Sequence, residues 1–381
     1  MNIRVRLFLL TCFVTVVFRG TSSIHAQQPQ RPQRPAPKTR EQLITDAVGY
    51  LKKSQAADGA WSRSASIGIT GFVTSGLLRG GNVPADDPQI VKALTLIESL
   101  KSDETGNLAN DPQLFQKNYV TSVNLNALLA SGQEKHRPLI EKAVKYLKEA
   151  QIDEGEDKPK DDMEYGGFGY QPGTRPDLSN TQFALDTLIL AGVPSSDPVF
   201  QKAAIYVSRM QNLASAHNSQ PWAGKINDGS FIYVASAGRG VSTPLDAPRP
   251  GYGSMTYSGL KCLSHAGFTE ADPRMDAGLK WLSKNYSVDV NPGRLSGAGG
   301  EGYYYYLTIM AKSLNTIKVD EVVDAEGKKH DWRADITRAL TNRQQPDGSW
   351  VNSFRNWQET NPDLCTAYAL IALSYTKPVV K

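Results

Sequence analysis

The sequence predicts an all-α protein folded as a single (α/α)6 toroid, in which six inner helices are surrounded by six outer helices. Two observations lead to this prediction. Helical segments of two kinds alternate along the chain from residue 40, and short motifs recur where one kind gives way to the other. No stretch shows sustained alternation of apolar and polar residues, so a β-sheet core is not expected.

The inner helices are predicted from segments that begin with a threonine and end with a glycine eleven positions later. These segments are 70–81, 121–132, 181–192 and 256–267. The residues between are apolar or small on nearly all sides, which is typical of a helix buried on all sides and closed by a carboxyl-terminal glycine. Two further segments, 303–314 and 366–375, match this pattern but lack the closing glycine.

The outer helices are predicted from amphipathic, more charged segments, one of which precedes each inner segment. They span residues 40–55, 88–101, 137–151, 197–212, 273–284 and 331–345. Six buried helices alternating with six half-exposed ones favour a closed ring with short connections. An open solenoid is the alternative, but it would need polar terminal repeats, and segment 366–375 is too apolar to be one.

One motif, Gln-x-x-Asp-Gly-x-Trp, occurs near both ends of the chain, as QAADGAW (55–61) and QQPDGSW (344–350). Each copy lies between an outer helix and the next inner one. The Asp-Gly pair suits a turn with positive φ, the glutamine can bond free groups at helix ends, and the tryptophan can cover the junction. We interpret both copies as structural staples and expect them to be neighbours, because the first and last helix pairs of a closed ring are adjacent.

The first 26 residues are predicted to be a signal peptide, with Arg4 and Arg6 before an apolar run (7–18) and Ala26 at the cleavage site. An uncleaved amino-terminal anchor is the alternative. Residues 27–39 are rich in Gln, Pro and Arg and are predicted to be a linker, and residues 40–381 the toroid. We therefore expect an exported protein, periplasmic or extracellular.

Composition restricts the partners. Cleavage after Ala26 would remove three arginines and no acid, which lowers the formal net charge from +4 to +1. A nearly neutral chain gives no electrostatic reason to expect nucleic acid as a partner; a membrane surface and an unidentified protein stay open. The two cysteines left, Cys262 and Cys365, lie in apolar helical patterns and are expected to be buried thiols. No cofactor is predicted.

The repeats resemble those of a known superfamily. The segments ending in Gly-x-Trp resemble the QW repeats of squalene–hopene and oxidosqualene cyclases. GGFGY with SNTQFAL, and DLCTAYALIAL, resemble repeats of protein prenyltransferase β subunits. The resemblance extends from about residue 40 to 376 and implies an α/α toroid with an apolar central cavity that binds isoprenoids.

The catalytic motifs of these families are missing. The Asp-x-Asp-Asp motif that supplies the proton in squalene–hopene-type cyclases does not occur on any predicted inner helix. The zinc ligands of the prenyltransferases are also absent, since the corresponding helix start, Gly251 to Met255, has neither Asp nor Cys, and Cys365 stands where the family has histidine. A site rearranged from Cys262, Cys365, Asp363 and His265 would not have the spacing of a known zinc site, so no metal is predicted.

Candidate site residues are the aromatic and acidic side chains of the inner helices. The predicted ligand-binding residues are Phe72, Tyr119, Phe183, Tyr257, Tyr304 and Tyr368. Aromatic faces pack on isoprenoid chains and stabilise carbocations; plain core filling is the alternative. The acids to test as proton donors or as stabilisers of positive charge are Asp177, Asp363 and Glu301, of which the two aspartates also have the spacing of helix caps.

The leading functional hypothesis is therefore an exported toroid that binds or processes an isoprenoid-type apolar ligand. One alternative is a non-catalytic envelope scaffold whose toroid binds a protein. Another is a secreted glycan-active enzyme, because (α/α)6 barrels also carry paired carboxylates in a cleft.

Overall fold

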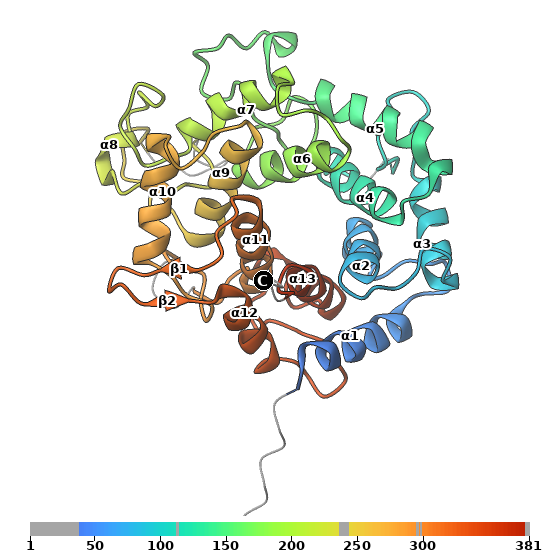
Figure 1. Ribbon diagram of the computed structural model, residues 1–381. Coiled ribbons are helices and arrows are strands. Elements are labelled where there is room, and N and C mark those ends of the chain that lie inside the picture. The colour runs from blue at the N-terminus through green and yellow to red at the C-terminus, as the bar shows by residue number, and fades with distance from the viewer. Residues whose placement is uncertain (1–37, 112–113, 236–243, 295–296, 298, 378–381) are drawn as a thin grey trace, which may run out of the picture. The chain divides into compact units, whose positions relative to one another are not determined.

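The computed structural model describes residues 38–111, 114–235, 244–294, 297 and 299–377. The predicted signal peptide, and the predicted linker up to residue 37, lie outside the described residues. Thr39, the last residue of the predicted linker, caps the first helix, since its hydroxyl accepts a hydrogen bond from the Gln42 backbone N–H. Within residues 38–377 the helices form two concentric rings (Figure 1).

Helices of the inner and outer rings alternate strictly in sequence. The inner helices are α2 (Gly68–Arg79), α4 (Lys117–Ser131), α6 (Leu178–Leu190), α9 (Gly253–His265), α11 (Tyr303–Thr316) and α13 (Pro362–Ser374). The outer helices are α1 (Arg40–Ser54), α3 (Pro88–Ser99), α5 (Arg137–Glu149), α7 (Pro198–Arg209), α10 (Pro273–Lys284) and α12 (Trp332–Thr341). Outside these rings lie the short helix α8 (Ala223–Ile226), a two-stranded antiparallel ribbon of β1 (Val322–Val323) and β2 (Lys329–His330), and three 3₁₀ turns (Glu134–His136, Glu154–Glu156, Asn356–Gln358).

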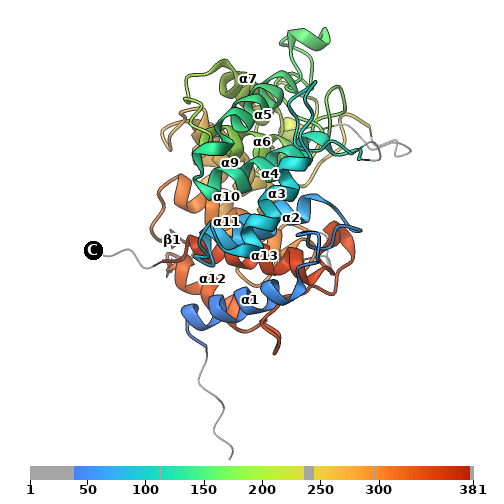
Figure 2. The same ribbon diagram turned by 90° about the vertical axis from the view of Figure 1, so that its right-hand side faces the viewer.

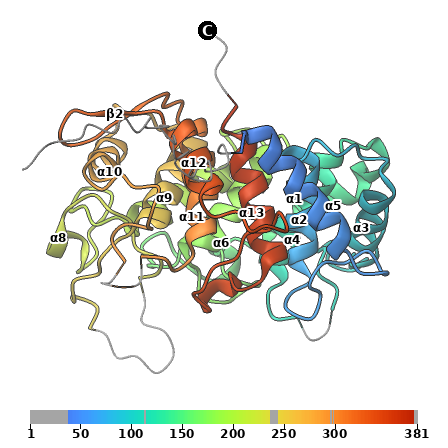
Figure 3. The ribbon, with the colours of Figure 1, turned by 90° about the horizontal axis from the view of Figure 1, so that it is seen from below.

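The inner ring is closed. Each inner helix packs against the next in chain order, and α13 returns to pack against α2. The first outer helix, α1, contacts both α12 and α13 and lies beside them in Figures 2 and 3. The predicted (α/α)6 toroid is therefore confirmed, and the open solenoid is wrong.

Three of the outer helices, α3, α7 and α10, begin at Asp-Pro pairs. The side chains of Asp87, Asp197 and Asp272 each accept a hydrogen bond from the backbone N–H two residues later, and a proline occupies the first helical position. The aspartate satisfies a free N–H group of the first turn, and proline has no N–H to leave unsatisfied there. Three inner helices, α4, α6 and α9, are followed by a glycine with positive φ, as at Gly132 (φ 62°).

The threonines that mark the inner helices have a structural role. The hydroxyls of Thr70 and Thr366 accept hydrogen bonds from the backbone N–H groups of Trp61 (3.2 Å) and Trp350 (3.1 Å). The same bond recurs at three other inner helices, with Thr121, Thr181 and Thr256 accepting from Leu108, Phe168 and Phe231 at 3.0–3.1 Å. Each threonine thus holds the preceding connection against the first turn of its helix.

The glutamines of the recurring motif join neighbouring outer helices. Gln55 Nε2 donates to the carbonyl of Gly59 in its own turn (3.0 Å) and to that of Gln89 at the start of α3 (2.8 Å). Gln344 Nε2 makes the matching bonds, to Gly348 (3.0 Å) and to Leu43 in α1 (2.9 Å). Each copy of the motif therefore links its own outer helix to the next one, α1 to α3 and α12 to α1, and the second copy closes the ring.

Two further glutamines show that the staple is more frequent than the sequence motif suggests. Gln151 bonds the carbonyls of Gly166 and Val199, and Gln211 those of Gly229 and Arg274, at 2.8–3.0 Å. The turn glycine is required because it has positive φ and approaches the next outer helix closely. At Gly348 (φ 93°), an added Cβ would lie 2.4 Å from the Asp46 carbonyl oxygen.

In the described part of the chain, no helix is both long and apolar enough to cross a membrane.

Candidate functional site

A cavity of about 190 Å³ opens at the amino-terminal ends of the inner helices. Its lining combines aromatic side chains with a smaller polar group. The aromatic part consists of Phe72, Tyr119, Tyr170, Phe183, Tyr233, Tyr252, Tyr305, Trp357 and Tyr368; the polar part includes Ser66, Gln116, Ser179, Ser254, Asn291, Arg294, Glu301 and Gln358. A mostly apolar hollow with a few polar groups is the usual form of a small-molecule site.

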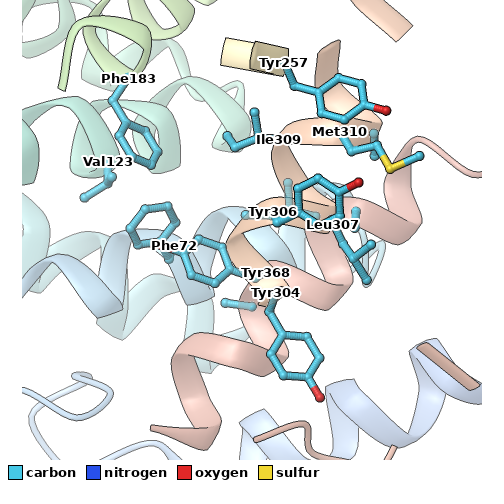
Figure 4. Packing of buried hydrophobic residues seen from close by; sticks show 14 of the residues in the cluster. Phe72, Val123, Phe183, Tyr257, Tyr304, Tyr306, Leu307, Ile309, Met310 and Tyr368 are labelled. Carbon is cyan, nitrogen blue, oxygen red and sulfur yellow. The ribbon is translucent and has the colours of Figure 1, made fainter. Parts of the chain in front are cut away.

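The inner wall is a continuous cluster of aromatic rings on the barrel axis. The ring of Phe72 lies 5.0 Å from that of Tyr368 and 5.7 Å from that of Phe183, centroid to centroid, in edge-to-face geometry. Tyr119 meets Phe183 at 5.2 Å and 90°. Figure 4 shows Phe72, Phe183 and Tyr368 converging from three helices. Edge-to-face packing stabilises the cluster, and all four of these aromatic residues line the cavity.

Tyr305 completes this wall from α11. Its hydroxyl lies 3.0 Å from Ser179 Oγ, and its ring is 6.0 Å from that of Tyr368. Burial raises the pKa of Tyr305 well above its ordinary value, so the phenol stays neutral and acts as a hydrogen-bond group.

The polar side of the cavity is organised around an ion pair. Arg294 forms a salt bridge with Glu301, and Glu301 Oε1 also accepts a hydrogen bond from Asn356 Nδ2 (2.8 Å). The guanidinium of Arg294 lies over the ring of Tyr252, 4.7 Å from its centroid. The Glu301 carboxylate therefore has a cation and an amide as partners on this side of the cavity.

Asp177, the amino-terminal cap of α6, lies behind the cavity wall. Its two oxygens accept from the backbone N–H (2.8 Å) and the side-chain amide (2.7 Å) of Asn180, and it shares a further hydrogen bond with Tyr233, which does line the cavity. Burial raises the pKa of Asp177 to about 6, against the lowering effect of these bonds. A ligand would therefore meet Tyr233 before this carboxyl group.

Asp363 is also behind the wall, in the first turn of α13. Its Oδ2 accepts a hydrogen bond from Ser62 Oγ at 2.6 Å. Of the three acids predicted from the sequence, only Glu301 lines the cavity, and the structure does not bring the three together in it.

The predicted ligand-binding aromatics divide into two groups. Phe72, Tyr119, Phe183 and Tyr368 line the cavity. Tyr257 and Tyr304 do not: Tyr257 packs against Tyr306 at 6.0 Å, and the Tyr304 hydroxyl donates to the Val351 carbonyl at 3.4 Å, so both serve the packing between helices. In Figure 4, Tyr304 lies apart from the Phe72 and Tyr368 rings.

Four aromatic residues of the lining were missed from the sequence because they lie on connections. Tyr170, Tyr233 and Tyr252 precede inner helices, and Trp357 lies in a 3₁₀ turn with a left-handed backbone (φ 63°). A helical period carries no information on such positions. The only available indication was GGFGY itself, whose last residue is Tyr170.

Among the described residues, no group of three His, Cys, Asp or Glu side chains lies close enough to hold a metal ion. Cys262 and Cys365 are both buried free thiols. Cys365 Sγ donates to the Glu359 carbonyl at 2.9 Å, which gives this thiol a structural partner.

The ring of paired helices is a fold that this chain shares with terpene cyclases and a protein prenyltransferase. The chain belongs to the family described as the squalene-hopene cyclase C-terminal domain, whose model matches residues 119–374. No curated protein matches the chain at a significant level.

Solved structures show the same fold at low sequence identity. The type II terpene cyclase MstE from Scytonema is similar over 88% of this chain and 98% of its own, with 15% identity and a TM-score of 0.55. Protein geranylgeranyltransferase-I from Candida albicans, in complex with GGPP, is similar over 87% and 91%, with 14% identity and a TM-score of 0.54. A glycosidase in complex with glucose is similar over 88% and 96%, with 15% identity and a TM-score of 0.50.

Proposed function

We propose that this protein is exported and binds an isoprenoid-type apolar ligand in the cavity of its toroid. The observation that carries the proposal is the aromatic wall formed by Phe72, Tyr119, Phe183, Tyr305 and Tyr368 at the barrel axis. When an apolar chain leaves water and packs against this wall, each Å² of buried apolar surface adds roughly 25 cal/mol to the favourable free energy of binding.

Two structural neighbours support the class of ligand. A variant of the Scytonema cyclase was solved with geranylgeranyl dihydroxybenzoate, and the Candida transferase with GGPP. Both compounds carry branched, unsaturated chains, which pack well against ring faces.

The volume of the cavity restricts how much of a ligand it accepts. About 190 Å³ is below the ~300–1,000 Å³ of ordinary ligand pockets and holds about fifteen water-sized spheres at ~10–15 Å³ each. We infer that the cavity takes a prenyl unit or a ring of similar size, and that the rest of a longer ligand remains at the mouth near Trp357.

The geometry favours binding over cyclisation. Protonating an alkene needs a neutral acid aimed at the ligand. Among the described residues Glu301 is the only carboxyl group lining the cavity, and it is paired with Arg294; Asp177 is separated from the cavity by Tyr233. The same single carboxylate does not provide the carboxylate pair that glycoside hydrolysis requires.

Native mass spectrometry of the full chain, purified after exposure to a lipid extract, tests the proposal. We expect a bound apolar molecule in the wild type and its loss in Ser179→Phe, which places a phenyl ring in the cavity. Ser196→Phe adds the same ring at an exposed position and should retain the ligand. A wild type that never carries a lipid would contradict the proposal and favour a scaffold role.

Processing of the ligand is tested separately. Incubation with squalene or a polyprenol, followed by product analysis, is expected to return the substrate unchanged. A new product that disappears in Asp177→Asn would instead make the protein an enzyme.

Export is tested by expressing the full chain and determining its amino-terminal residue. Cleavage after Ala26 would give a mature chain that begins at Gln27. An intact amino terminus in a membrane fraction would show an anchor instead.

A further inference from the structure

A second, smaller pocket lies at the opposite end of the barrel, where the inner helices finish. Its volume is about 40 Å³. It is lined by Arg79, the last residue of α2, by Lys312 of α11 and by Tyr375, which follows α13; Ser75 and Asn126 supply further polar groups. We call these five residues and their hollow the basic pocket.

Positive charge at this end exceeds the negative charge available to balance it. Asp186 is almost fully buried and is shared by Lys261 (2.7 Å), Lys312 and His265 (2.9 Å). One carboxylate therefore faces two lysines. Arg79 adds a further positive charge, and in the described part of the chain its side chain forms no hydrogen bond or ion pair.

Polar atoms in the basic pocket also lack partners. The Ser75 hydroxyl belongs to a residue only 5% exposed and has no hydrogen-bond partner, and the side-chain oxygen of Asn126 is likewise buried and unpaired. A buried hydroxyl left unpaired costs about 1–3 kcal/mol, so the Ser75 O–H indicates a place where an acceptor atom of a ligand completes the bonding. The Asn126 oxygen is itself an acceptor and does not support a bond to an anion.

The carboxyl ends of the inner helices account for part of this charge. Helix ends carry a partial negative charge that stabilises nearby cations, and Arg79 occupies the last turn of α2. That effect is confined to the last turn, whereas Lys261 and Lys312 lie further inside their helices. It also leaves the Ser75 and Asn126 atoms unexplained.

We propose that the basic pocket binds an oxyanion, a carboxylate or phosphate group, through Arg79, Lys312 and the Ser75 hydroxyl. Arginine and lysine form charge-assisted hydrogen bonds to both groups. The volume suits this size, because about 40 Å³ accommodates roughly three water-sized spheres at ~10–15 Å³ each, comparable with the oxygens of one such group.

The oxyanion has two conceivable sources, a free ion or the head group of an amphiphile. Phe72, Phe183 and Tyr368 line both the basic pocket and the upper cavity, so they form the partition between them. A tail attached to a bound head group would lie against this partition. The anion site itself does not depend on what occupies the upper cavity.

Titration calorimetry with inorganic phosphate, in a dilute chloride buffer free of other oxyanions, tests the proposal on the full chain. We expect saturable binding at one site, weakened about tenfold or more in Arg79→Gln. Arg63→Gln removes the same charge at the other end of the barrel, where Arg63 is half exposed and paired with Asp58, and should bind phosphate within twofold of the wild type.

Ser75→Ala removes only the hydroxyl and provides a second variant if Arg79→Gln misfolds; we expect it to weaken binding several-fold. Dodecyl phosphate, kept below its micelle concentration, separates the two sources. Binding tenfold tighter than that of inorganic phosphate identifies a head-group site, and equal binding a free-ion site. Absence of phosphate and dodecyl phosphate binding to the wild type, or equal binding by Arg79→Gln, would overturn the proposal.

Discussion

The side-chain nitrogen of Gln344 donates to the backbone carbonyl of Leu43 at 2.9 Å, although 301 positions of sequence separate them. This bond joins the last outer helix to the first. It has the same form as the bond from Gln55 to Gln89, which joins α1 to α3 over 34 positions. The closure of the ring therefore uses the same contact as three other steps around it, those from α1 to α3, from α5 to α7 and from α7 to α10.

Replacing Gln344 with alanine should destabilise the fold by about 1–3 kcal/mol, because two hydrogen bonds to backbone carbonyls are lost at ~0.5–1.5 kcal/mol each. Equilibrium denaturation in urea measures the change. Gln345→Ala is the matched control, since that side chain is exposed and makes a single long bond of 3.4 Å; its effect should stay within about 0.5 kcal/mol. Equal effects of the two substitutions would show that the staple does not hold the ring.

The threonine at the start of an inner helix gives a second stability prediction. Thr366→Val keeps the shape of the side chain but removes the acceptor for the buried Trp350 N–H. We expect a loss of about 1–3 kcal/mol, measured in the same denaturation experiment. Thr95→Val, on the exposed face of α3, loses only a bond to its own helix and should change stability by a few tenths of a kcal/mol. If Thr366→Val left the free energy of unfolding unchanged, the recurring threonine would contribute through packing alone.

The ring was predictable from the sequence because periodicity and recurring turns are local properties. The lining of the cavity was predictable only in part. In the run Tyr303–Tyr306 the period of a helix requires successive rings to point in different directions, but it does not say which ring faces the axis. Packing against α9 and α13 decides that, and it selects Tyr305 rather than Tyr304 for the cavity.

The buried charges were missed for a related reason. Segment 256–267 was interpreted as apolar or small on nearly all sides, although it contains Lys261, and segment 181–192 contains Asp186. A single charged residue, taken alone, argues against a buried helix. The two charges are tolerated in buried helices because Asp186 of α6 pairs with Lys261 of α9, and no local sequence pattern reveals that pair.

Stability should depend on pH through Asp177. Its pKa is raised by burial from 3.8 to about 6, so between these values the folded state binds more protons than the unfolded state. The contribution of Asp177 therefore falls as pH rises through this window, by about 3 kcal/mol at ~1.4 kcal/mol per pH unit. Asp177→Asn keeps an acceptor for the Asn180 N–H and should remove this dependence.

The measurement is the difference in unfolding free energy between wild type and Asp177→Asn, taken at pH 4 and at pH 7.5. Other titrating groups contribute equally to both chains and cancel. We expect the wild type to lose stability relative to the variant as pH rises. A difference that is constant with pH would show that Asp177 is solvated rather than buried.

The most damaging single substitution should be Asp186→Asn. Burial opposes ionisation of Asp186, but Lys261 and Lys312 hold its pKa well below the ordinary value, and burial lowers the pKa of Lys261 to about 8. Asp186 raises the pKa of both lysines, so its removal leaves two buried amines that either remain unpaired cations or lose their protons, and either outcome costs free energy. Breaking a buried pair in this way costs about 3–5 kcal/mol, whereas an exposed pair contributes about 0–1 kcal/mol.

Asp276→Asn is the control for this substitution, because Asp276 is 51% exposed and pairs with Lys280 one helical turn away. It should change stability by less than about 1 kcal/mol. The Asp186 contribution is present above the unfolded-state pKa and is lost only as pH falls through the lower folded-state value, so the two variants should differ fully at pH 7.

Saturating phosphate should also partly rescue Asp186→Asn if an oxyanion occupies the basic pocket, since it would supply the missing negative charge. Equal stability of the two variants in urea would show that water reaches the group formed by Asp186, Lys261, Lys312 and His265. Solvent would then screen the excess positive charge around the basic pocket.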